Sequence, residues 1–196
     1  MKPVFAKLAS LATIFAIVIA PVALAAPGDN VGTGDIAGDA AAIDSSDIFN
    51  LTTKTLALVK RAFDAAGDPI PTGSVLPAGT EVRFMIYVSN DTPVAVNDLS
   101  VQDILDNSVF AYQTDSIKVD NSVAACAADP CTVLEEDAIF DAVELTADLT
   151  DLIDTDAVSY DGGTFTIDAG NQNVANAEVV VAADTVWAMT FTVTMQ

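Results

Sequence analysis

From residue 53 onward, the chain alternates short runs rich in Val, Ile, Thr, Phe and Tyr with Pro, Gly, Asn and Asp. In residues 81–89 and 186–195, large apolar side chains recur at every second position, which places them on one face of an extended strand. Many short strands separated by turn residues are typical of an all-β fold. Further strands are predicted at residues 56–60, around Leu99 and Val101, and around Ile117 and Val119.

Two later segments depart from this simple alternation. Residues 158–160 and 164–167 flank Asp161-Gly162-Gly163 and predict a hairpin, in which the glycine pair is expected to supply the positive φ of a tight turn. Residues 137–156 follow neither the strand period nor the helix period cleanly, so we expect an inserted loop with one short helix there.

The first 25 residues have the three parts of a Sec signal peptide. Lys2 and Lys7 precede an apolar run at residues 8–20, and Ala23-Leu24-Ala25 forms a small-x-small end. A membrane anchor is the competing interpretation, but the run is short for a hydrocarbon layer of roughly 30 Å and Pro21 interrupts it. We therefore expect cleavage after Ala25 or Ala26, export to the cell surface, the extracellular space or the periplasm, and a mature chain without a transmembrane segment.

Residues 26–52 form a leader rich in Gly, Asp and Ala, without a sustained apolar period. This composition predicts a flexible segment ahead of a folded domain at residues 53–196. A leader of this kind can act as a plain spacer, or it can add as a strand to the open sheet edge of a neighbouring molecule. The apolar side chains that such a strand would offer are Ile43, Ile48, Phe49 and Leu51.

The composition excludes several classes of function. The chain has 28 acidic residues, 7 basic residues and no His, with a net charge of −21. Nucleic acid is a poor partner because its phosphates are bound by clustered Lys and Arg. The lack of His excludes Ser-His-Asp and Cys-His catalysis and imidazole zinc sites, and two Cys cannot complete a thiolate metal site within one chain. Without the signal peptide the net charge becomes −23, yet 52% hydrophobic residues indicate a folded chain.

Cys126 and Cys131 form an even pair in a chain expected to be exported, which predicts a disulfide. The alternative, a redox dithiol, is disfavoured because four residues separate the thiols and no basic residue or His stands beside them.

Spaced carboxylates raise the question of calcium, which takes six to eight oxygen ligands. No stretch fits the Asp-x-Asp-x-Asp-Gly calcium loop, so we favour a solvated acidic face and expect no cofactor beyond weak calcium binding. Glycoside hydrolysis also needs paired carboxylates, but with aromatic platforms for the sugar, and Trp187 lies on the apolar face of its strand. We expect no enzymatic activity. The spaced set, which remains the candidate metal site, consists of Asp148, Asp151, Asp154 and Asp156.

Residues 75–103 resemble a known family. The turn Pro77-Ala78-Gly79, a strand ending in Tyr87-Val88-Ser89-Asn90, and a second strand ending at Asp103 are similar to the conserved repeat called domain of unknown function eleven. The resemblance covers roughly residues 56–196, with residues 122–156 as an insertion. It implies an Ig-like antiparallel β-sandwich of about seven strands, as found in envelope and secreted proteins of bacteria and archaea. The family occurs in tandem arrays, whereas this chain has one copy.

These features lead to two functional hypotheses. In the first, the chain is a secreted or cell-surface structural protein that assembles with itself or with other envelope proteins, as a filament or surface-layer subunit with its leader as a donated strand. The alternative is an adhesin module that binds calcium or carbohydrate.

Overall fold

The computed structural model describes residues 29–34, 45–50, 56 and 58–196. The chain divides into two units, residues 1–53 and residues 54–196. In the first unit, β1 (Asp29–Gly34) and β2 (Ser45–Asn50) form an antiparallel pair. The sequence pattern does not predict this pair, because backbone hydrogen bonds between strands require no apolar period. The expected signal peptide lies outside the described residues, as do Ile43 and Leu51.

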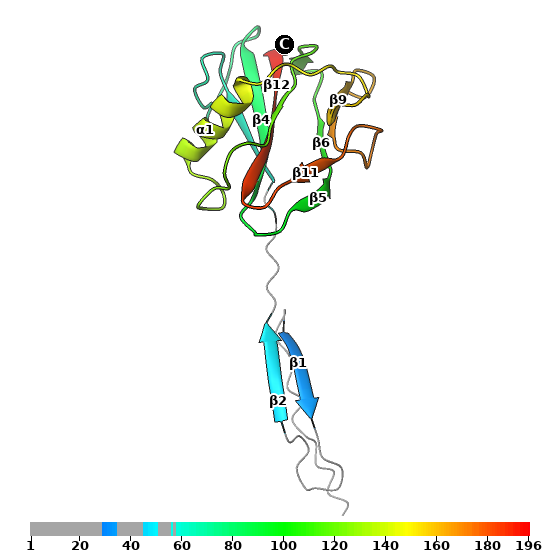
Figure 1. Ribbon diagram of the computed structural model, residues 1–196. Coiled ribbons are helices and arrows are strands. Elements are labelled where there is room, and N and C mark those ends of the chain that lie inside the picture. Colours follow the sequence, from blue (N-terminus) through cyan, green and yellow to red (C-terminus); the bar gives the residue numbers. More distant parts are fainter. Residues whose placement is uncertain (1–28, 35–44, 51–55, 57) are drawn as a thin grey trace, which may run out of the picture. The chain divides into compact units, whose positions relative to one another are not determined.

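The centre of the second unit is a five-stranded antiparallel sheet (Figure 1). Its two long strands, β4 (Glu81–Asn90) and β12 (Thr185–Met195), pair along ten consecutive positions. Both were predicted from their alternating pattern, and the structure confirms them. The sheet is completed by β3 (Leu58–Phe63) beside β4, and by β7 (Phe110–Tyr112) and β8 (Lys118–Asp120) beside β12.

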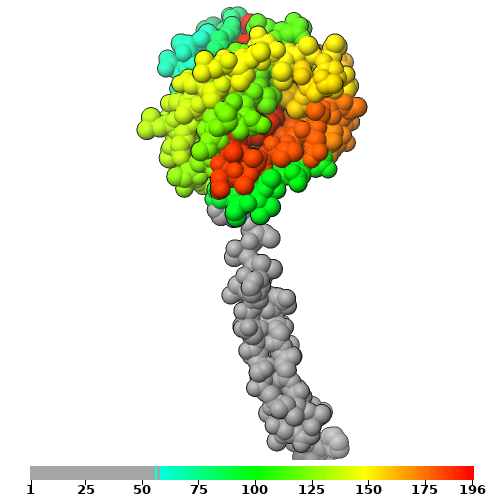
Figure 2. Space-filling model, viewed as in Figure 1, coloured from blue at the N-terminus to red at the C-terminus, as the bar shows by residue number. Residues whose placement is uncertain are grey.

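Two smaller antiparallel sheets complete the β structure of this unit. One has the order β6 (Val101–Ile104), β10 (Thr166–Ala169), β9 (Val158–Asp161). The other pairs β5 (Val96–Leu99) with β11 (Val179–Val181), which lie side by side at the surface, as Figure 1 and Figure 2 show.

The single strand predicted around Leu99 and Val101 is therefore wrong, because the chain breaks into β5 and β6 at Ser100. Gly170 explains the break. It has φ +86°, and a Cβ there would stand 2.2 Å from the carbonyl oxygen of Leu99, so only glycine permits this close approach.

The predicted hairpin of β9 and β10 is confirmed, but its turn differs from the prediction. The residue with positive φ is Phe165, at +57°, and not the glycine pair. The carboxylate of Asp161 accepts hydrogen bonds from the amide of Gly163 and the hydroxyl of Thr164. The loop is therefore closed by a side chain, and a tight two-residue turn is not needed.

The short helix expected within residues 137–156 is α1 (Val133–Glu144), which begins before that range and ends within it. A capping box fixes its start: Thr132 accepts from the amide of Glu135, while the carboxylate of Glu135 accepts from the amide of Thr132. No helix in the described part of the chain is long and apolar enough to cross a membrane.

The five-stranded sheet is buried on both faces. On one face, Trp187, Met189 and Phe191 of β12 join an apolar cluster with residues of β6, β9, β10 and β11. On the other face, Val186 and Ala188 pack in a second cluster with α1. The predicted apolar seam of the last strand is thus confirmed, and the alternate positions Val186, Ala188 and Thr190 are buried too. The second unit contains ten strands from β3 to β12 and one helix, so the described fold is mostly β.

Candidate functional site

An apolar groove of about 320 Å³ opens beside β3. Half-buried side chains from three parts of the chain line it: Leu76 from the loop between β3 and β4, Phe84 from β4, and Phe110 from β7. The loop is held in place at the end of β12, where the amide of Gly79 donates to the carbonyl of Met195. The groove therefore has an apolar floor that is not completely covered. Ile70, Val82 and Met195 also line it.

One ion pair beside the groove connects two sheets. Lys60 Nζ on β3 lies 2.5 Å from Asp103 Oδ2 on β6, and 4.3 Å from the centroid of the Phe84 ring. The Asp103 side chain is 15% exposed and that of Lys60 is 35% exposed. A cation over a ring face and beside a carboxylate is stabilised by both. The contact links β3 to β6, although no residue of β6 lines the groove.

Both of these strands end their sheets. In the described part of the chain, β3 pairs with β4 alone and β6 pairs with β10 alone. The last two residues of β3 are covered on their outer side, because Phe63 bridges to Pro69 and the amide of Ile70 donates to Ala62. Residues 58–61 and 101–104 thus present one unpaired side each, and such an edge is a template for an added strand.

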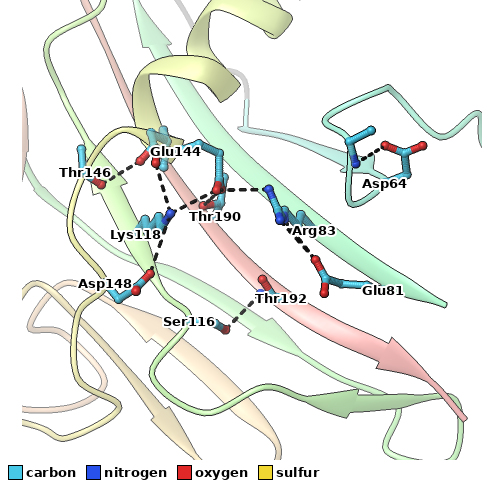
Figure 3. A network of polar contacts seen from close by, with 12 residues as sticks. Asp64, Glu81, Arg83, Ser116, Lys118, Glu144, Thr146, Asp148, Thr190 and Thr192 are labelled. Carbon is cyan, nitrogen blue, oxygen red and sulfur yellow. Dashed lines mark hydrogen bonds and ion pairs between the residues drawn. The ribbon is translucent and has the colours of Figure 1, made fainter. Parts of the chain in front are cut away.

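A polar network joins α1 to the sheet on the opposite side of the unit (Figure 3). The carboxylate of Glu144, at the end of α1, accepts from Lys118 at 3.1 Å, from Arg83 at 3.4 Å and from the hydroxyl of Thr190 at 2.9 Å. Lys118 also donates to the backbone carbonyl of Glu144. One carboxylate thereby binds β4, β8 and β12 together.

A polar cavity of about 220 Å³ adjoins this network. Its two cations, Arg83 and Lys118, already pair with Glu81, Glu144 and Asp148. With these partners engaged, the arrangement supports a structural role better than ligand binding or catalysis.

A second charged contact of α1 is largely buried. Glu136 is 7% exposed and accepts from Tyr87 at 2.8 Å and from Arg61 at 2.9 Å. Burial, and then the hydrogen bond to Glu136, raise the pKa of Tyr87 well above its usual range. Sequence reasoning missed this contact because its members are 49 and 75 residues apart.

Three of the four candidate calcium ligands, Asp148, Asp151 and Asp154, have separate partners. Asp148 lies 3.8 Å from Lys118 and is 61% exposed, while Asp151 accepts from Tyr112 at 2.5 Å and from the amide of Asp115. Asp154 accepts from the amide of Asp156 and from Thr150, and these bonds lower its pKa. Among the described residues, no group of three or more potential ligands comes together around one point.

The predicted disulfide is present. Cys126 and Cys131 are bonded, with their Cα atoms 5.3 Å apart, and both side chains belong to the cluster beneath α1. Thr132, which caps α1, follows at once, and the amide of Ala127 donates to the Glu135 carboxylate. The bridge therefore holds the start of the helix against the sheet.

Of the residues expected to mediate interaction, Ile48 and Phe49 lie on β2. Sequence reasoning did not identify the groove, because its lining comes from segments more than 100 residues apart and includes no motif. Comparisons with protein-family models, with curated proteins and with solved structures found no match to this chain.

Proposed function

We propose that this protein is an exported structural subunit of an extracellular filament or surface layer. Its residues 53–196 act as an Ig-like β-sandwich, and its leader acts as a strand donated to a neighbour. The observation that carries the proposal is β2: a six-residue strand within a leader that forms a separate unit from residues 54–196. A strand outside the main unit is what assembly by strand addition requires.

The surface charge is consistent with this function. A mature chain with five basic and 28 acidic residues stays soluble through self-repulsion, so that specific contacts decide where copies join. The exported location follows from the signal-peptide pattern of residues 1–25.

The test uses the mature full-length chain, residues 26–196, examined by light scattering and electron microscopy with and without millimolar calcium. We expect ordered assemblies for the natural sequence and none for a double variant, Ile48→Asp with Phe49→Asp. The matched control, Ser45→Asp with Ser46→Asp, adds the same charge to the same strand and should still assemble. A natural chain that stays monomeric at high concentration in both conditions contradicts the proposal. Calcium-dependent thermal stabilisation without assembly would favour the adhesin alternative.

A further inference from the structure

We infer that the groove beside the open edge of β3 is the acceptor site for β2 of a second copy. This inference rests on the proposed function and names the partner surface that it requires. Three observations carry it: the free edge of β3, the apolar lining of the groove, and the charge at its rim.

The backbone supplies the first requirement. In the described part of the chain, β3 leaves residues 58–61 unpaired on the side away from β4. β2 pairs with β1 along one side, so its other side remains free to pair within the described part of the chain. Strand addition would give these edges the hydrogen bonds that they lack.

The apolar lining supplies the second requirement. A strand that adds to a sheet edge turns every second side chain toward the same face. Ile48 and Phe49 are neighbours in β2, so their side chains are expected on opposite faces of the strand. Whichever face turns toward the groove therefore brings one large apolar side chain to it. The groove offers Leu76, Phe84 and Phe110 as half-buried apolar partners. Covering them would remove apolar surface from water, which is the main driving force for association.

Charge supplies the third requirement. The leader has five aspartates and no basic residue within residues 26–52. Lys60 and Arg61 line the groove with side chains 35% and 41% exposed, and they are two of the four basic residues among residues 58–196. They pair with Asp103 and Glu136, and among the described residues no carboxylate lines the groove, so an acidic segment meets less repulsion here than over an acidic surface. Asp47, two residues before Phe49, would share its face of the strand.

The first test changes the groove. Leu76→Asp puts a carboxylate among the lining side chains, whereas Val75→Asp adds the same charge to the same loop at a side chain that is 95% exposed and does not line the groove. We expect Leu76→Asp to raise the concentration needed for assembly at least about tenfold, because it replaces an apolar contact with β2 by a carboxylate that is costly to cover. Val75→Asp should assemble like the natural chain. Equal assembly of the two variants overturns the assignment of the groove while leaving self-assembly intact.

The second test detects the contact directly and does not depend on the first variant folding well. A full-length chain with Phe49→Cys is mixed with a mass-tagged chain with Leu76→Cys under mild oxidation, and mass spectrometry identifies the linked peptides. We expect several times more linked heterodimer than with Val75→Cys as the second chain. No excess over that control overturns the inference.

A chain with both Phe49→Cys and Leu76→Cys, oxidised at high dilution, tests whether the leader occupies its own groove. Linkage within single chains there would identify the chain's own leader as the occupant and overturn the assignment to a second copy. If the natural chain does not assemble at all, the proposed function fails, and this outcome is distinct from assembly without preference for Leu76.

Discussion

The two edges of the five-stranded sheet differ in how far other parts of the chain cover them. On the β8 side, Ile117 bridges to Leu149, Lys118 binds the end of α1, and the helix covers the adjoining face. On the β3 side, residues 58–61 have no strand on their outer side in the described part of the chain, and an apolar groove adjoins them. The first side is closed by contacts within the domain, whereas the second has surface left to bind. Substitutions on the closed side should therefore change stability, and substitutions on the open side should change assembly.

The strongest test of the face of the sheet that α1 covers removes an aromatic ring. Phe140 of α1 is 3% exposed and stacks on Phe63 with ring centroids 4.0 Å apart. Phe140→Ala should lower the free energy of unfolding by about 3–5 kcal/mol, because it removes apolar contacts and leaves a cavity. Chemical denaturation monitored by Trp187 fluorescence would measure this loss.

The control for this substitution lies on the same helix. Leu134 is 81% exposed, so Leu134→Ala should change stability by no more than about 0.5 kcal/mol. If both variants lose the same amount, α1 does not seal this face of the sheet as described. Under conditions where Phe140→Ala remains folded, it should assemble at the same protein concentration as the natural chain.

We expect a smaller loss of stability when a charged contact between α1 and the sheet is removed. Glu144→Ala removes the carboxylate that accepts from Lys118, Arg83 and Thr190, and it leaves these donors in a largely buried place. We expect a loss of about 2–3 kcal/mol in the free energy of unfolding. Asp148→Ala is the matched control, since Asp148 binds the same lysine from an exposed position 3.8 Å away and should contribute less than about 1 kcal/mol. Equal effects of the two variants would show that Glu144 acts only as a surface charge.

This comparison also shows what the sequence could and could not predict. β4, β12 and the disulfide were predictable because their signals are local: a period of two, or two nearby cysteines in a chain expected to be exported. The break at Ser100 was not, because it depends on the backbone of Gly170 approaching Leu99 from 71 residues away.

The same limit applies to the charged residues. The spacing of the aspartates within residues 148–156 left a metal site open as the less favoured interpretation. In the structure, Asp151 accepts from Tyr112 and Asp154 accepts from Thr150, and the sequence pattern reveals neither donor. Lys60 and Asp103 meet although 43 residues separate them, so their ion pair could not be identified from either segment.

The smallest expected effect is on stability at the start of α1, and it varies with pH. The amide of Ala127, together with the side chain and amide of Thr132, holds the pKa of Glu135 below its usual range. A carboxyl with a lowered folded-state pKa stabilises the fold above its unfolded pKa of about 4.3, and this contribution is lost as the pH falls through the folded value. The difference in unfolding free energy between the natural chain and Glu135→Gln should therefore be greatest near neutral pH and shrink below about pH 4.

The control is Leu134→Ala, which alters no ionisable group. The free energy of unfolding of this variant should change with pH in the same way as that of the natural chain. A Glu135→Gln difference that stays constant from pH 3 to pH 7 would mean that the carboxylate charge does not hold the helix start, and that the hydrogen-bonding shape of the side chain suffices there.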